Sequence, residues 1–153
     1  MVKNKSLLIA ASLFAFILGL TYIASGSLCI YNWIVTSLIN DTAILERFIP
    51  QDPWLGIVLI SIGLTYNASA YYLMRGNMVL SIASLLVGGG LAVIIMSLQV
   101  LATLAYAVDA IITNEELKLN NVVDNLLRID GVLGYVSLIP FFLGYKFYKE
   151  IRG

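Results

Sequence analysis

Residues 6–40 read SLLIAASLFAFILGLTYIASGSLCIYNWIVTSLIN and contain no charged side chain. A helix crosses roughly 30 Å of bilayer hydrocarbon with about 20 apolar residues, so this run is long enough to span a membrane. Three more uncharged runs follow, at 53–74, 76–108 and 131–145. The sequence therefore predicts an all-α integral membrane protein with four transmembrane helices.

The composition of the 153 residues agrees with that class and excludes several others. Of these residues 60% are hydrophobic and 12% are charged, and the mean hydropathy is +0.92, which is too high for a water-soluble domain. Nine basic residues balance nine acidic ones, which argues against a nucleic-acid-binding protein. The chain has no histidine and one cysteine, so haem, zinc, iron–sulfur and internal disulfide chemistry are not expected. We expect no cofactor, although bound lipid is compatible with this composition.

The fourth uncharged run is short for a membrane span. Lys146 and Lys149 follow it, and long cationic side chains can reach the interface while their stems stay in the hydrocarbon. Aromatic residues at the same end are typical of a membrane interface. We therefore expect one transmembrane domain, 1–153, with spans at about 6–39, 54–74, 77–108 and 131–148.

Charged residues divide unevenly between the two ends of these spans. One side holds both termini and the turn at Arg75, and its charges sum to +5. The other side holds the connections 41–52 and 109–130, and its charges sum to −5. Because Lys and Arg accumulate in cytoplasmic segments, we expect a multi-pass protein of the cell membrane with both termini in the cytoplasm.

The connection before the last span carries the pattern of an amphipathic helix at about 114–130. Thr113 and Glu116 match a capping box, apolar residues follow at helical spacing, and Gly131 is placed to end the helix. We expect this helix to lie flat on the outer membrane surface. A docking face for a partner and a lid over a pore are the alternatives.

A seven-residue repeat links the first two spans. GLTYIAS at 19–25 and GLTYNAS at 63–69 agree at six positions. Counting the helical rise from each entry point places Tyr22 and Tyr66 near mid-depth on helices of opposite direction. We favour close helix packing through small residues such as Gly19. The alternative is a midplane site built from the two tyrosines and Asn67.

Two further features lie within the third span. Gly88, Gly89 and Gly90 form a triplet that costs helix propensity, and we interpret it as a close helix contact. A hinge and a cleft for a lipid-like ligand are the alternatives. Gln99, like Asn32 in the first span, needs a hydrogen-bond partner in this setting, and we expect a partner helix to supply it.

No sequence motif for catalysis is present, and no Asp, Glu, Lys or Arg falls within the core of a span, which disfavours proton-driven transport. We expect a non-catalytic accessory or structural subunit of a larger membrane complex that packs by small-residue helix faces. In this oligomeric assembly it contacts the bilayer and other membrane subunits. The alternative is a homo-oligomeric channel or facilitator for a small neutral solute or lipid.

Overall fold

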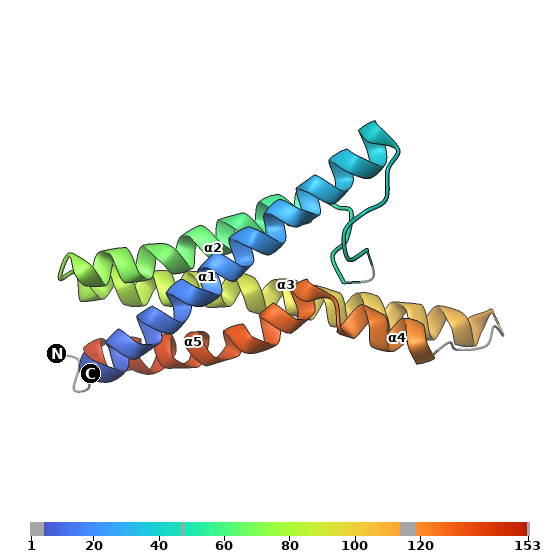
Figure 1. Cartoon of the computed structure of the whole chain (residues 1–153). Coiled ribbons are helices and arrows are strands. Elements are labelled where there is room, and N and C mark those ends of the chain that lie inside the picture. Colours follow the sequence, from blue (N-terminus) through green and yellow to red (C-terminus); the bar gives the residue numbers. More distant parts are fainter. Residues whose placement is uncertain (1–4, 47, 114–118, 153) are drawn as a thin grey trace.

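The computed structural model describes residues 5–46, 48–113 and 119–152, and every regular element among these residues is helical (Figure 1). The prediction of an all-α chain is thus confirmed. The elements are α1 (Lys5–Ile34) with its π-helical continuation η1 (Val35–Ile39), α2 (Pro53–Met74), α3 (Met78–Ile112), α4 (Leu119–Leu126) and α5 (Ile129–Arg152).

Helices α1 and α2 form an antiparallel pair held by glycine contacts. A Cβ atom on Gly63 would lie 2.5 Å from the Gly19 carbonyl oxygen, and a Cβ atom on Gly26 would lie 2.5 Å from the Gly56 carbonyl oxygen. Gly19 and Gly26 lie seven residues apart on α1, and Gly56 and Gly63 lie seven residues apart on α2, so the two glycines of each helix fall on one face. The backbones therefore touch directly at two levels.

Helices α3 and α5 form the second antiparallel pair, which is again built on small residues. A Cβ atom on Gly134 would lie 2.5 Å from Met96 Cβ, and one on Gly144 would lie 3.3 Å from Leu86 Cγ. The two helix pairs pack on each other, and the beginning of α1 and the end of α5 lie at the same end of the bundle (Figure 1).

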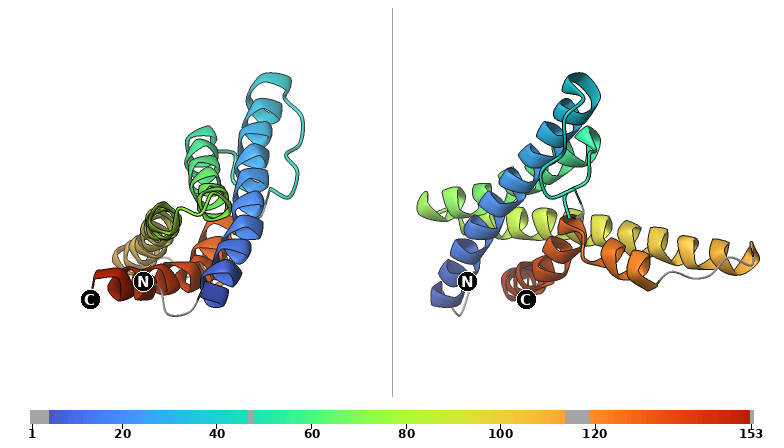
Figure 2. Two further views of the ribbon diagram at one scale, coloured as in Figure 1. Left: turned by 90° about the vertical axis from the view of Figure 1, so that its left-hand side faces the viewer. Right: turned by 45° about the vertical axis from the view of Figure 1, so that its right-hand side comes forward.

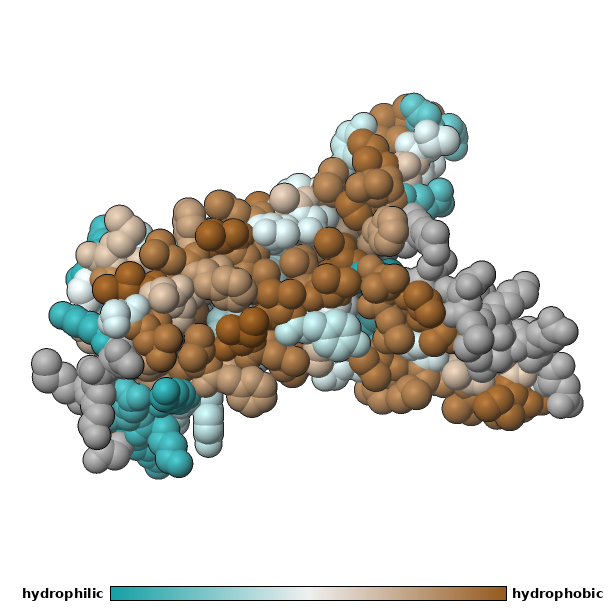
Figure 3. All heavy atoms as spheres, turned by 60° about the horizontal axis from the view of Figure 1, so that its bottom comes forward, coloured by the Kyte–Doolittle hydropathy of each residue, from teal (hydrophilic) through white to brown (hydrophobic). Residues whose placement is uncertain are grey.

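Three helical segments are long and apolar enough to cross a membrane: Lys5–Ile39, Pro53–Met74 and Met78–Ile112. Apolar side chains cover the middle of the visible face, and polar ones gather at its ends (Figure 3). The chain is therefore a membrane protein with three candidate spans. Helix α5 is less apolar, because its first turn contains Asp130 and its last turn contains Lys149 and Arg152, and a fourth crossing stays a prediction.

The end of the bundle opposite the termini is splayed. The last turns of α1 and of α3 point away from each other in both figures, and α4 runs back alongside the end of α3 (Figures 1 and 2). The described part of the expected amphipathic helix, α4, thus packs against α3, and its lying flat on the outer membrane surface stays a prediction.

The boundaries around α4 also differ from the sequence pattern. Thr113 ends α3 instead of capping the next helix, because its amide and hydroxyl both donate to the Asp109 carbonyl oxygen, each at 2.9 Å. Glu116, its expected partner in the capping box, lies outside the described residues. Gly131 is buried within α5 and does not end the amphipathic helix, since α4 already stops at Leu126.

Candidate functional site

The two tyrosines of the sequence repeat meet in the centre of the bundle. Tyr22 and Tyr66 are almost fully buried, and their ring centroids lie 6.0 Å apart at an interplanar angle of 43°. The Tyr22 hydroxyl lies 3.0 Å from the Ser137 hydroxyl of α5. The repeat thus brings together polar groups from three helices.

The threonines of the repeat do not join this centre. Thr21 donates its hydroxyl hydrogen to the Ile17 carbonyl oxygen, and Thr65 donates to the Ser61 carbonyl oxygen, each four residues back on its own helix. The tyrosines and glycines face the neighbouring helices, and the threonine hydroxyls are satisfied locally.

Two buried polar atoms near this centre have no hydrogen-bond partner within the described part of the chain. They are the Tyr66 hydroxyl and the Asn67 Oδ1 atom. Asn67 Oδ1 occupies the space that a side chain on Gly19 would fill, so the Gly19 Cα–H group points toward it. Such a weak contact stabilises less than an ordinary hydrogen bond.

The glycine triplet of α3 supports close packing on two sides. A Cβ atom on Gly88 would lie 3.1 Å from Tyr66 Cδ1, and one on Gly89 would lie 2.8 Å from Phe141 Cβ. Gly90 is less constrained, since its Cβ atom would lie 3.8 Å from Phe141 Cε2. The triplet lies within a continuous α-helix, so the structure contains a contact here and no unwound turn.

Three serines form a closed hydrogen-bond ring that the sequence analysis did not identify. The hydroxyl of Ser12 lies 3.2 Å from those of Ser69 and Ser81, and these two lie 3.1 Å apart. All three side chains are buried. Each of the three hydroxyls can donate one hydrogen bond and accept one within the ring. The ring therefore links α1, α2 and α3 near the end of the bundle that holds the termini.

Asn32 fastens the connection 40–52 to the end of α1. Its Nδ2 atom donates to the carbonyl oxygens of Ile44, at 2.9 Å, and Ile49, at 3.3 Å, and its Oδ1 atom accepts from the Ile44 amide at 3.0 Å. The partner of this buried amide is therefore a loop backbone, where we expected a helix.

Gln99 performs a similar task on the other side of the molecule. Its Nε2 atom donates to the Asn125 carbonyl oxygen at 2.8 Å, near the carboxyl end of α4. Helix carbonyls in the last turn lack intrahelical partners, so Gln99 satisfies one of them and anchors α4 to α3.

The outer connections also meet at the start of α5. The Ile129 amide donates to the Phe48 carbonyl oxygen at 3.1 Å. Arg128 Nε pairs with Asp130 Oδ1 at 3.3 Å, and the Asp130 side chain is only 3% exposed. Asp130 is also favoured at this position because anionic side chains stabilise helix amino termini.

The chemistry available in the described core is neutral hydrogen bonding. The central groups are hydroxyls, amides and aromatic rings, and the described residues contain no group of three His, Cys, Asp or Glu side chains that could hold a metal ion. Cys29 is buried against α2, 3.3 Å from the place of a Cβ atom on Gly56. Its role is packing between the first two helices.

Comparisons with known proteins gave no family match and no related protein. No family model matches the chain, and neither the curated proteins nor the solved structures contain a significant match.

Proposed function

We propose that this protein is a non-catalytic subunit of a larger complex in the cell membrane, crossing the membrane four times with both termini in the cytoplasm. The fourth crossing is supported by the contacts of α5, which packs along α3 from Gly134 beside Met96 to Gly144 beside Leu86. This stretch of α3 belongs to a candidate span, so α5 lies at the same depth. The charges of +5 and −5 at the two ends support the orientation.

The observation that carries the subunit role is an exposed apolar face on the outer part of α3. This helix has 35 residues and a length of about 52 Å, whereas the bilayer hydrocarbon needs about 30 Å. The expected span of 77–108 is therefore longer than a perpendicular crossing needs, and we take the hydrocarbon to end near Leu98, about 20 residues after Met78. Beyond that point five large apolar side chains are between 53% and 74% exposed: Leu101, Leu104, Val108, Ile111 and Ile112.

These five residues, which we call the outer stripe, follow one another at spacings of three, four, three and one, so they share one side of the helix. A contiguous apolar patch outside the hydrocarbon marks a contact with another molecule. The segments around it carry a net charge of −5. The partner that fits is a membrane subunit with an apolar outer segment and basic residues around it.

The interior of the chain supports the same assignment, because its close helix contacts and most of its buried hydrogen bonds are already made within the chain. The small residues Gly19, Gly63 and Gly134 are occupied by contacts within the chain. Asn32 and Gln99 have hydrogen-bond partners within the chain as well. Association with another subunit therefore falls to the outer surface, and the small-residue helix faces that the sequence suggested for it are already used.

One observation favours the alternative of a facilitator for a small neutral solute. The Tyr66 hydroxyl and Asn67 Oδ1 are buried and unpaired in the described structure, and a polar solute could satisfy them. Against this, Tyr22, Leu59, Ile62 and Leu85 fill the centre of the single chain and are at most 1% exposed. A pathway would have to form between copies of the chain.

The experiment is co-purification of a double variant, Leu104→Gln with Ile111→Gln, from the native membrane in mild detergent. Both side chains are more than half exposed, so the fold should tolerate the change. A matched control is Leu38→Gln with Ile39→Gln, which alters two similarly exposed residues of η1, the continuation of α1.

We expect the outer-stripe variant to lose its partner chains and the control to keep them. Each large side chain that a partner fully buries contributes about 1.5–3 kcal/mol, so two lost contacts weaken binding severely. Retention of the same partners by the outer-stripe variant would contradict the proposal. Purification of the unaltered protein as a pure homo-oligomer would favour the facilitator, which flux into liposomes then tests.

A further inference from the structure

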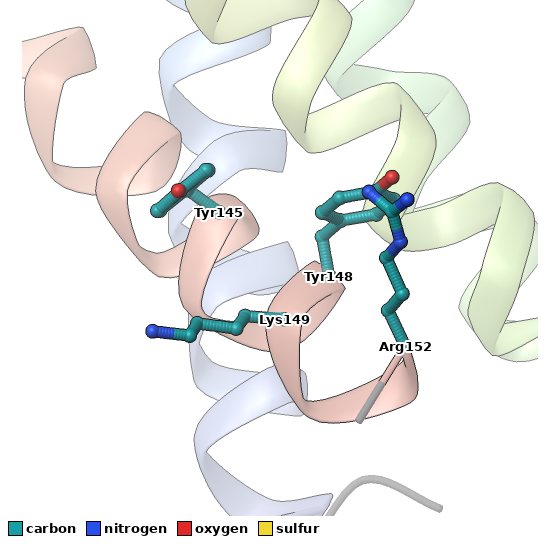
Figure 4. A pocket seen from close by; sticks show the side chains of 4 residues that line it. All are labelled: Tyr145, Tyr148, Lys149 and Arg152. Atoms are coloured by element: carbon teal, nitrogen blue, oxygen red, sulfur yellow. The ribbon is translucent and has the colours of Figure 1, made fainter.

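A hollow of about 350 Å³ lies at the end of α5 that faces the cytoplasm in the proposed orientation. Its lining consists of Tyr145, Tyr148, Lys149 and Arg152. These residues form two tyrosine–cation pairs four positions apart, Tyr145 with Lys149 and Tyr148 with Arg152, on adjoining faces of the helix. Figure 4 shows the Arg152 guanidinium turned back along the helix toward Tyr148. The hollow therefore offers two cations and two aromatic side chains.

A second hollow of about 300 Å³ adjoins the first and has an almost wholly apolar lining. It lies between α3 and α5, and Tyr148 lines both hollows. From Val79, near the start of α3, it extends to Val87, a rise of about 12 Å toward the membrane centre. Its other lining residues are Ile82, Ala83, Leu86 and Ile151.

The two hollows together place cationic side chains beside an apolar lining, which is the combination that a phospholipid headgroup and acyl chain require. We propose that they form a binding site for an anionic phospholipid of the cytoplasmic leaflet. Arg152 binds the phosphate, because a guanidinium presents paired donors to phosphate oxygens. Lys149 adds a compact positive charge from the neighbouring side of the helix, where its side chain extends away from Arg152 (Figure 4). One acyl chain lies in the apolar hollow along α3.

Position and charge both fit this ligand. Tyrosine at the boundary of the two hollows matches the preference of amphipathic rings for the headgroup level. The surrounding end of the molecule carries a net charge of +5, and Arg75 there stacks over the Tyr71 ring, 4.6 Å from its centroid. Anionic lipids are attracted to such juxtamembrane basic clusters.

The same phosphate chemistry could come from a free phosphate ion, so the site needs a test that separates the two sources. The delipidated protein is titrated in detergent with phosphatidylglycerol, with phosphatidylcholine of the same acyl chains, and with inorganic phosphate, and bound ligand is measured by native mass spectrometry. We expect phosphatidylglycerol to bind about tenfold more tightly than phosphatidylcholine. Inorganic phosphate at the same concentrations should not bind.

Three variants assign the binding to the two hollows. Lys149→Gln with Arg152→Gln should lower the affinity for phosphatidylglycerol about tenfold. Lys146→Gln, a control cation on the same helix outside the lining, should leave the affinity unchanged. Ala83→Phe, at an exposed position of the apolar hollow, should weaken lipid binding by obstructing the acyl chain.

Several outcomes would overturn the proposal. Equal binding of phosphatidylglycerol and phosphatidylcholine would remove the role of the cations, and equal losses in the Lys146 variant and the double variant would make the effect nonspecific. Binding of inorganic phosphate that is insensitive to Ala83→Phe would identify an ion site without an acyl chain. An unchanged size-exclusion profile shows that each variant is folded, and none of these readouts depends on the proposed subunit role.

Discussion

Replacing Gly63 by alanine tests whether α1 and α2 are held by direct backbone contact. The new Cβ atom would lie 2.5 Å from the Gly19 carbonyl oxygen and 2.7 Å from Ile23 Cγ1. Ordinary van der Waals contact of a Cβ atom lies at 3.4–4 Å. Because the nearest atom belongs to the backbone of α1, the two helices must move apart by about 1 Å to relieve the overlap.

The cost of that movement can be weighed against the gain in helix propensity. Forcing an extra carbon into a close-packed site costs about 1–3 kcal/mol, and a gap of about 1 Å also weakens the neighbouring contacts. Alanine gains up to about 1 kcal/mol over glycine inside a helix. We therefore expect Gly63→Ala to lower the free energy of unfolding by about 1–2 kcal/mol.

Gly90→Ala is the matched control, because it makes the same exchange within a candidate span at a position with room. Its Cβ atom would lie 3.8 Å from Phe141 Cε2, which is an ordinary contact. We expect this variant to be neutral or more stable by up to about 1 kcal/mol. The assay is unfolding in mixed micelles of mild detergent and SDS, followed by circular dichroism. Equal stability of the two variants would refute the account of the α1–α2 contact.

Three further predictions follow from the hydrogen bonds and the orientation. Ser81→Ala should lower the free energy of unfolding in the same assay by about 1 kcal/mol, since one hydroxyl hydrogen of the serine ring loses its acceptor; no change would contradict the ring. Asn32→Leu should speed hydrogen exchange at the Ile44 amide, whereas Asn32→Asp keeps the acceptor and should preserve protection, so equal exchange in both variants would argue against this bond. A membrane-impermeant thiol reagent applied to intact cells should label Glu46→Cys but not a cysteine appended after the carboxyl terminus. Buried Cys29 serves as the unreactive background. Labelling of the appended cysteine would show that α5 does not cross the membrane.

The sequence predicts the helical segments well because charges and turns delimit them. Charged residues bound the runs that become α1, α2 and α3, and Asp52 caps α2 by accepting from the amides of Trp54 and Leu55. The equal spacing of seven residues between the contacting glycines of α1 and between those of α2 sets the register of the helix contact. The prediction from sequence used only the seven-residue repeat in this region.

The outer connections were harder to predict because their structure depends on long-range contacts. Thr113 fits a capping box in sequence, yet both its amide and its hydroxyl donate to the Asp109 carbonyl oxygen at the end of α3. Asn32 is likewise satisfied by the backbone of a loop that begins several residues later. Local patterns do not reveal such partners.

The serine ring was missed for a related reason. Serines are common in membrane helices, and hydrogen bonding between Ser12, Ser69 and Ser81 depends on the relative register of three helices. No single segment carries that information. The same holds for Ser137, whose hydroxyl meets Tyr22 only because α5 packs where it does.

The most direct test of the proposed function is the composition of the native particle. The protein is extracted from its own membrane in mild detergent and its assemblies are weighed by native mass spectrometry. The account predicts stoichiometric foreign chains that dissociate when Leu104 and Ile111 of the outer stripe are replaced by glutamine. A particle that contains only copies of this chain would contradict it.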